Sequence, residues 1–119
     1  MISDEKFPRK ERLLKTKDFK SVYKKGALFK SDSFFLYCMP NMLKNNRIGF
    51  SISSRNIKLA SSRNRIRRLF REVYRRRKKD LKTGFDMVLV LKKDLGRAIS
   101  YKEVEGLFLK LAKGANLLA

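Results

Sequence analysis

Basic side chains dominate one segment of the sequence, SSRNRIRRLFREVYRRRKK, which runs from Ser61 to Lys79. Between Arg55 and Lys79 the chain holds nine arginines and three lysines, and Glu72 is the single acid. A planar guanidinium can donate paired hydrogen bonds to phosphate oxygens, which suits arginine to that anion better than lysine. The segment therefore predicts a surface that binds phosphate groups.

The spacing of the same residues predicts a helix with two unlike sides. At about 100° per residue, its apolar side chains fall in one arc and a polar stripe falls opposite. Exposed helices that are merely solvated alternate both signs of charge, because like charges four residues apart destabilise by roughly 0.2–0.5 kcal/mol per pair. We therefore favour a bound polyanion over a solvated face. The arc holds Ile66, Leu69, Phe70, Val73 and Tyr74, and the stripe holds Asn64, Arg68, Arg71 and Arg75.

The charge of the whole chain supports this interpretation. Its 119 residues include 31 Lys and Arg against 11 Asp and Glu, a net charge of +20, which attracts polyanions and makes nucleic acid the leading partner class. No apolar run approaches the roughly 20 residues of a membrane-spanning helix. The first residues, MISDEKFPRK, lack the apolar core of a secretory signal. We expect a cytoplasmic protein that binds no membrane and has no obligate protein partner.

Side chains that could cleave RNA are scarce. The sequence has no histidine, and its acids are scattered without the clustering that holds catalytic metal ions. The single cysteine, Cys38, lies in the apolar run FFLYCM, where a small buried hydrophobe is the favoured interpretation over a nucleophile. We expect no catalytic residue and no metal site in the protein itself.

The elements that must position these residues follow from periodicity and turn signals. Thr16 is expected to cap a helix over 17–25 that ends at Gly26, and a capping box from Ser100 to Glu103 opens a last helix. Together they give an α+β fold in α-β-β-β-α-β-α order, a small sheet covered by helices in a two-layer sandwich. Residues 1–119 form one RNA-binding domain, with 1–12 as a flexible basic segment. The remaining predictions are strands over 27–30, 33–39, 47–53 and 85–91, a basic loop over 54–61, and the arginine helix over 62–80.

Two aromatic pairs lie outside the arginine helix. Phe19 and Tyr23 share a face of the first helix, and Phe35 and Tyr37 share a face of a strand. Such rings either stack on bases or pack in the core, and the pattern leaves both open. Three small residues on a neighbouring strand, Gly49, Ser51 and Ser53, are expected to leave a groove open beside them.

The run RNRIRRL from Arg63 to Leu69, preceded by GFSIS from Gly49 to Ser53, resembles the protein subunit of bacterial ribonuclease P. The likeness extends to KDFKSVYKKG, from Lys17 to Gly26, and to the FLY of Phe35 to Tyr37, so it covers most of the chain in order. Residues 54–60 depart from the family pattern, because they are one residue longer and lack its glycine.

The resemblance implies a non-catalytic subunit that binds a catalytic RNA and promotes removal of the 5′ leader from precursor tRNA. It implies that the RNA, not the protein, uses Mg²⁺. It also implies a leader-binding cleft lined by Phe19, Tyr23, Phe35 and Tyr37, and an RNA-facing set of Arg63, Asn64, Arg65, Arg68 and Arg71. We add Arg55, Arg67 and Arg75 to the RNA-facing set.

Two other functions compete with this one. A ribosomal protein or RNA chaperone would share the basic helix but would not need the aromatic pairs. A DNA-binding regulator would require a helix-turn-helix pair, which the expected elements do not include.

Overall fold

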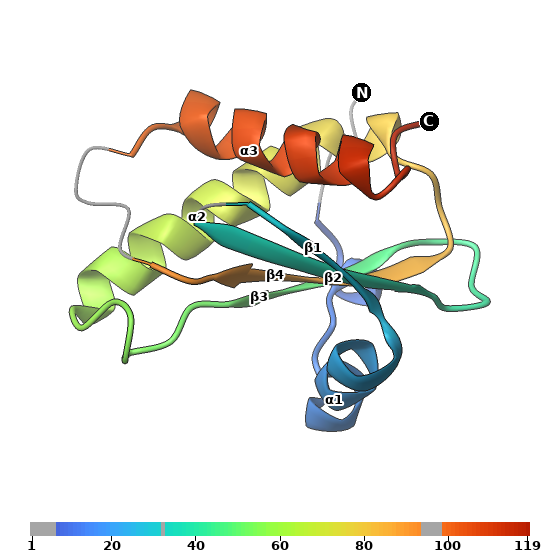
Figure 1. Ribbon diagram of the computed structural model, residues 1–119, viewed down its shortest axis with the longest axis horizontal. Coiled ribbons are helices and arrows are strands. Elements are labelled where there is room, and N and C mark those ends of the chain that lie inside the picture. Colours follow the sequence, from blue (N-terminus) through green and yellow to red (C-terminus); the bar gives the residue numbers. More distant parts are fainter. Residues whose placement is uncertain (1–6, 32, 94–98) are drawn as a thin grey trace.

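The computed structural model describes residues 7–31, 33–93 and 99–119, which form a four-stranded sheet with helices on both faces (Figure 1). The α+β class and the predicted order of elements are confirmed. The strands are β1 (Ala27–Lys30), β2 (Phe34–Pro40), β3 (Arg47–Ser51) and β4 (Phe85–Leu91). The helices are η2 (Arg9–Glu11), α1 (Thr16–Lys25), α2 (Ala60–Arg77), η3 (Lys78–Asp80) and α3 (Tyr101–Gly114).

The strand order is β1-β2-β4-β3, which places β4 in the interior of the sheet. Its continuous apolar run, FDMVLVL, predicted such a central position. β4 pairs antiparallel with β2, with Leu36 opposite Leu89, and parallel with β3, with Ile48 opposite Met87. Since parallel neighbours need a crossover connection, α2 is the link that returns the chain from β3 to β4.

The two faces of the sheet are covered unequally. α2 and α3 lie on one face, and α1 lies on the other (Figure 1). The larger hydrophobic core joins Phe34, Leu36 and Met87 of the sheet to α2 and α3. A smaller core under α1 contains Val22 and Val88. The predicted two-layer sandwich is thus the sheet with α2 and α3, and α1 adds a short layer opposite.

The ends of the helices test the predicted caps. Thr16 is not a cap: it is the first residue of α1, and the flanking Lys15 accepts the first hydrogen bonds through its carbonyl, 3.0 Å from the Asp18 nitrogen. α1 ends at Gly26 as predicted, where a Cβ would lie 2.5 Å from the Val22 carbonyl oxygen. The capping box of α3 is confirmed, since the Glu103 backbone N–H donates to Ser100 Oγ at 3.2 Å.

The segment before α1 packs against the rest of the protein. The Leu13 N–H donates to the Ile48 carbonyl at 3.0 Å, and Arg12 forms a parallel bridge with Ile48, so the segment borders the free edge of β3. The Phe7 ring meets Tyr74 edge-on, with centroids 5.4 Å apart. Residues 7–12 thus lie between two packed side chains, Phe7 and Leu13, while the flexibility of 1–12 stays a prediction. Residues 1–6 lie outside the described part of the chain.

In the ranges that the structure describes, none of the helices combines the length and the apolar character of a membrane span.

Candidate nucleic-acid interface

The arginine helix α2 is fixed to the sheet by its apolar side. Ile66, Phe70, Val73 and Tyr74 are buried, and the Phe70 ring packs edge-on against Phe34 with centroids 5.2 Å apart. Leu69 is half-buried at the margin of this core. The predicted arc is confirmed, and the opposite side of the helix stands on a rigid support.

Four exposed residues form the outer side of the first turns of α2, and we call them the arginine surface: Asn64, Arg65, Arg68 and Arg71. Arg68 and Arg71 make no hydrogen bond or ion pair with any other described residue. Their guanidinium donors are thus unused by the described part of the protein. This is the arrangement expected of groups that meet an external anion.

The other arginines of α2 also bind within the protein. Arg65 donates to the Ile99 carbonyl at 2.7 Å, and Arg67 donates to Asn64 Oδ1 at 3.2 Å. A guanidinium carries several N–H donors, so these bonds orient the side chain and leave donors for a ligand.

Arg75 is the least available member of the predicted set. It donates two hydrogen bonds to Glu72, at 3.0 and 2.7 Å, and Arg76 donates a third at 3.0 Å. These bonds, first from Arg75 and then from Arg76, hold the pKa of Glu72 below its ordinary value. Arg75, which helical angles placed in the outward stripe, therefore forms an ion pair within the protein.

The atypical loop before α2 is anchored to the protein. Ile57 is buried, and the Asn56 side chain donates to the Leu91 carbonyl at 3.1 Å. Arg63 closes the loop by donating to the carbonyls of Ile57 and Lys58, at 2.8 and 3.0 Å. Arg55 remains exposed at its outer end. Arg63 thus has a structural role here besides the predicted contact with RNA.

The four aromatic residues predicted for a cleft lie on the α1 side of the sheet, and we call them the aromatic face: Phe19, Tyr23, Phe35 and Tyr37. None is fully buried. The Tyr23 and Tyr37 rings meet edge-on, with centroids 4.9 Å apart, so the structure joins one residue of each predicted pair. Whether these rings bind a leader stays a prediction.

Phe19 occupies the place where a groove was expected. A Cβ on Gly49 would lie 2.4 Å from Phe19 Cζ, so the ring fits only because position 49 has no side chain. The expectation that Gly49 leaves open space is therefore wrong at this point, because the ring fills it.

Phe35 lies beneath two lysines. The Nζ atoms of Lys30 and Lys92 are 5.2 and 5.0 Å from its ring centroid, within the range of a cation–π contact. Both lysines were missed from the sequence, although Lys30 pairs with Phe35 in the β1-β2 register and Lys92 follows β4 directly.

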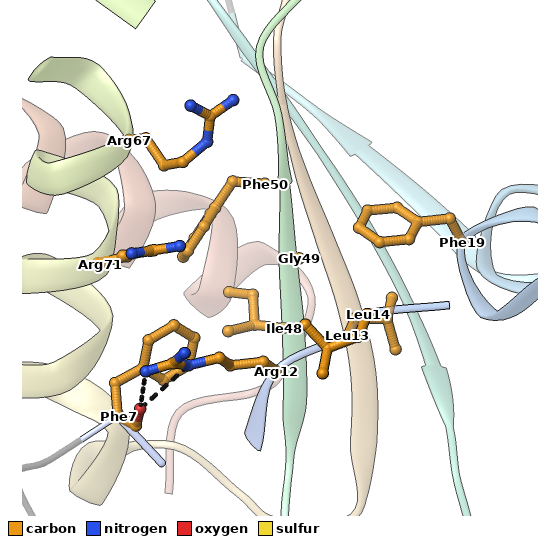
Figure 2. A pocket seen from close by; sticks show the side chains of 10 residues that line it. All are labelled: Phe7, Arg12, Leu13, Leu14, Phe19, Ile48, Gly49, Phe50, Arg67 and Arg71. Atoms are coloured by element: carbon orange, nitrogen blue, oxygen red, sulfur yellow. Dashed lines mark hydrogen bonds between the residues drawn. The ribbon is translucent and has the colours of Figure 1, made fainter. Parts of the chain in front are cut away.

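A pocket of about 130 Å³ joins the two surfaces at the edge strand β3 (Figure 2). Arg67 and Arg71 reach it from α2 on one side of β3, and Phe19 reaches it from α1 on the other (Figure 2). Arg12 also lines it and donates to the Phe7 carbonyl at 3.2 and 2.8 Å. The place of Arg12 depends on the packed N-terminal segment, which the sequence did not predict.

A partly buried set of ion pairs connects β3, β4 and α1. Arg47 on β3 donates to both carboxylate oxygens of Asp86 on β4, at 2.8 and 2.6 Å, and lies 3.6 Å from Asp18 on α1. Asp86 is only 5% exposed and also accepts from Asn41 at 2.9 Å. The hydrogen bond to Asp86 raises the pKa of Arg47, so the guanidinium group stays protonated. The contact between Arg47 and Asp18 therefore helps to hold α1 against the sheet.

The described residues contain no group of three or more side chains that could ligate a metal ion. Cys38 is buried, and burial raises the pKa of its thiol, which disfavours the reactive thiolate. Its predicted role as a small core residue is confirmed.

Comparisons with known proteins agree with this geometry. The model of the family described as Ribonuclease P matches residues 7–116. The ribonuclease P protein component of Alkaliphilus oremlandii is 36% identical over 107 residues, which cover 90% of this chain and 92% of that protein. The solved RNase P protein from Thermotoga maritima superposes with a TM-score of 0.77 at 27% identity, covering 87% of this chain and 96% of that one.

A solved RNase P protein from Staphylococcus aureus shares the fold, with a TM-score of 0.81 at 24% identity over 92% of this chain and 98% of that one. The matched region includes the arginine surface, the aromatic face and the pocket between them. The chain therefore belongs to the ribonuclease P protein component family.

Proposed function

We propose that this chain is the protein subunit of a ribonuclease P ribonucleoprotein, in which it binds the catalytic RNA and helps to remove the 5′ leader of precursor tRNA. The observation that carries the proposal is the arginine surface, where Arg68 and Arg71 have no partner among the described residues. Family membership supports RNA phosphate as the anion that they bind.

The arginine surface supports a contact with folded RNA that is mainly electrostatic. Each phosphate neutralised by an arginine releases counterions, so the affinity should fall steeply with salt concentration. A fixed helix with several outward guanidinium groups reads backbone shape and charge, and Asn64 can add a hydrogen bond to a ribose hydroxyl or a base edge.

The aromatic face supports a contact with an unpaired strand. Tyr23 and Tyr37 present exposed ring surface, and stacking on aromatic rings is the usual means of holding single-stranded bases. Lys30 and Lys92, above Phe35, supply positive charge for the phosphates of the same strand. We assign the 5′ leader to this face.

The chemical step belongs to the RNA in this proposal. The protein sequence has no histidine, and most of the acids that the structure describes are paired with arginines or lysines, which disfavours a general base from the protein. We place the catalytic Mg²⁺ ions on the RNA. In this proposal the protein supplies positive charge and binds the 5′ leader.

Reconstitution with a bacterial ribonuclease P RNA at low Mg²⁺ tests the proposal directly. We expect the protein to stimulate cleavage of precursor tRNA at the 5′ end of the mature tRNA, and we expect no cleavage by the protein alone. Failure to stimulate a competent RNA would favour an RNA-binding protein without a part in cleavage. Cleavage by protein treated with nuclease to remove RNA would contradict the non-catalytic role.

A further inference from the structure

A second row of basic side chains lies on α1, which covers the opposite face of the sheet from α2 and its arginine surface (Figure 1). At about 100° per residue, Lys17, Lys20 and Lys24 fall within an arc of about 60°, and we call them the lysine stripe. All three side chains are exposed, whereas Val22, on the other side of the helix, is buried against the sheet. The stripe therefore extends into solvent from a helix whose inner side is fixed.

The protein does not neutralise the lysine stripe. The three ammonium groups make no hydrogen bond or ion pair with any residue in the described ranges. Asp18, the one acid of α1, is directed to the sheet instead, where its carboxylate lies 3.6 Å from Arg47. The charges of the stripe are thus available to an external anion.

The arrangement is unfavourable for α1 by itself. Lys20 lies three residues after Lys17 and four before Lys24, and like charges at these spacings destabilise a helix. Lys17 also lies in the first turn, where the helix dipole disfavours a cation. A helix that is merely solvated mixes both signs of charge, as α3 does with Glu103 and Glu105 among its lysines. The lysine stripe therefore indicates a ligand that neutralises it.

The aromatic face beside the stripe indicates which anion this is. Tyr23 lies three residues after Lys20 and directly before Lys24, so its ring borders the stripe on the surface of α1. Tyr23 is 40% exposed, and its ring meets Tyr37 edge-on. Sites for single strands combine stacking rings with positive charge along the backbone. A strand stacked on these rings would therefore bring its next phosphates to the stripe.

We propose that the lysine stripe binds phosphates of the 5′ leader beyond the nucleotides that the aromatic face holds, so that the leader continues from the rings across α1. The inference rests on the proposed function, which assigns the leader to the aromatic face. Each further phosphate that the stripe neutralises releases counterions. The holoenzyme should therefore bind a long leader more tightly than a leader that ends at the rings.

Affinity of the reconstituted holoenzyme for two precursor tRNAs tests the stripe. Their leaders have about 5 and about 15 nucleotides, which spans the usual range of single-strand site sizes. We expect the unmodified protein to favour the longer leader. The triple variant Lys17→Gln, Lys20→Gln and Lys24→Gln should lower affinity for the long leader about tenfold and its salt slope by up to about two, with the short leader unchanged. Equal affinity of the unmodified holoenzyme for both leaders would overturn the proposal.

A second triple variant controls for net charge. Lys102→Gln, Lys110→Gln and Lys113→Gln remove exposed lysines from α3, so the charge of the protein falls by the same amount. We expect this variant to keep the preference for the long leader. A loss equal to that of the α1 variant would mean general charge attraction, and would overturn the lysine stripe as a site.

Two further measurements separate binding from folding. Arginine at the three positions of the stripe keeps the charge and should keep the preference for the long leader. The melting temperature of the α1 glutamine variant should not fall, because the substitutions relieve repulsion between like charges on one helix. A loss of the preference in the arginine variant as well would contradict a contact that depends on charge.

The remaining outcomes distinguish this inference from the proposed function. An equal loss of affinity for short and long leaders would place the stripe on another part of the RNA and overturn the leader contact. If the unmodified protein stimulates cleavage but the α1 variant binds both leaders normally, the inference fails and the proposed function stands. Failure of the unmodified protein to stimulate cleavage would overturn both.

Discussion

The arginine surface of α2 and the aromatic face under α1 hold their side chains in opposite ways. Arg68 and Arg71 extend from a helix whose other side is buried, and their charged ends make no hydrogen bond or ion pair with any described residue. The aromatic rings are held by neighbours: Tyr23 by Tyr37, Phe19 by Gly49, and Phe35 by two lysines. One surface is therefore open and charged, and the other is packed and partly apolar.

This difference predicts two kinds of selectivity. A charged surface on a rigid helix recognises phosphates in any sequence, and its contribution to RNA affinity decreases as the salt concentration rises. A set of rings recognises unpaired bases, and its contribution depends on whether a single strand is present. Mutations in the two regions should therefore be separable by salt dependence and by the presence of a leader.

The largest expected effect is at the ion pairs that join β3, β4 and α1. Asp86→Ala leaves Arg47 without its main partner between β3, β4 and α1. We expect a loss of roughly 2–4 kcal/mol in the free energy of unfolding, somewhat below a fully buried pair because Arg47 touches solvent. Urea denaturation measures it. Asp80→Ala, which removes an exposed partner of Arg77, should change stability by less than about 1 kcal/mol. Equal effects would contradict a structural role for Asp86.

The next effect separates the arginine surface from the aromatic face. Arg68→Gln combined with Arg71→Gln should weaken binding to the catalytic RNA and lower its salt slope by up to about one per lost phosphate contact. Leader-bearing and mature tRNA should be affected equally in the holoenzyme, because neither arginine is expected to touch the leader. Arg76→Gln is the matched control, since Arg76 already pairs with Glu72. An unchanged slope in the double variant would show that the arginine surface faces solvent.

The aromatic face gives the complementary result. Tyr37→Ala should weaken holoenzyme affinity for precursor tRNA by about 1–3 kcal/mol, as expected for a lost stacking contact, and hardly change affinity for mature tRNA. Tyr37→Phe keeps the ring and should retain most of the affinity. If Tyr37 only packs against Tyr23, Tyr37→Ala will lower the melting temperature and will weaken the affinity for precursor and mature tRNA equally. That result would rule out the leader contact.

Much of the architecture was predictable because hydrophobic periodicity is local. The run FDMVLVL indicated a central strand, and the spacing of Ile66, Phe70, Val73 and Tyr74 indicated the buried side of α2. The capping box at Ser100 needed only residues three apart. In each case the physical cause lies within one turn or one strand of the signal.

The parts that were missed depend on contacts between distant segments. Phe7 packs on Tyr74 and the Leu13 N–H bonds to Ile48, and neither partner is visible from the N-terminal sequence. Helical angles place Arg75 in the outward stripe, but its pairing with Glu72 depends on which rotamers the two side chains adopt. The position of Phe19 over Gly49 required the packing of α1 on the sheet. Tertiary placement, rather than local propensity, decides these features.

The smallest effect concerns Glu72, the one acid on α2. Glu72→Gln removes the carboxylate that pairs with Arg75 and Arg76, which raises the positive charge beside the arginine surface. We expect a modest rise in RNA affinity, within about tenfold, and a slightly steeper salt slope, while the exposed ion pair lost contributes at most about 0.5 kcal/mol to stability.

The dependence of this effect on pH follows from the lowered pKa of Glu72. The hydrogen bonds from Arg75 and then Arg76 keep the carboxylate ionised below its ordinary pKa, so its stabilising contribution is present above that value and is lost as pH falls through the lowered one. The difference between variant and unmodified protein should shrink over the same acid range. Glu105→Gln is the charge-matched control, because it removes a carboxylate on α3 that pairs with Arg77. If it raises RNA affinity as much as Glu72→Gln, net charge alone accounts for the gain, and the position of Glu72 beside the arginine surface has no special part in it.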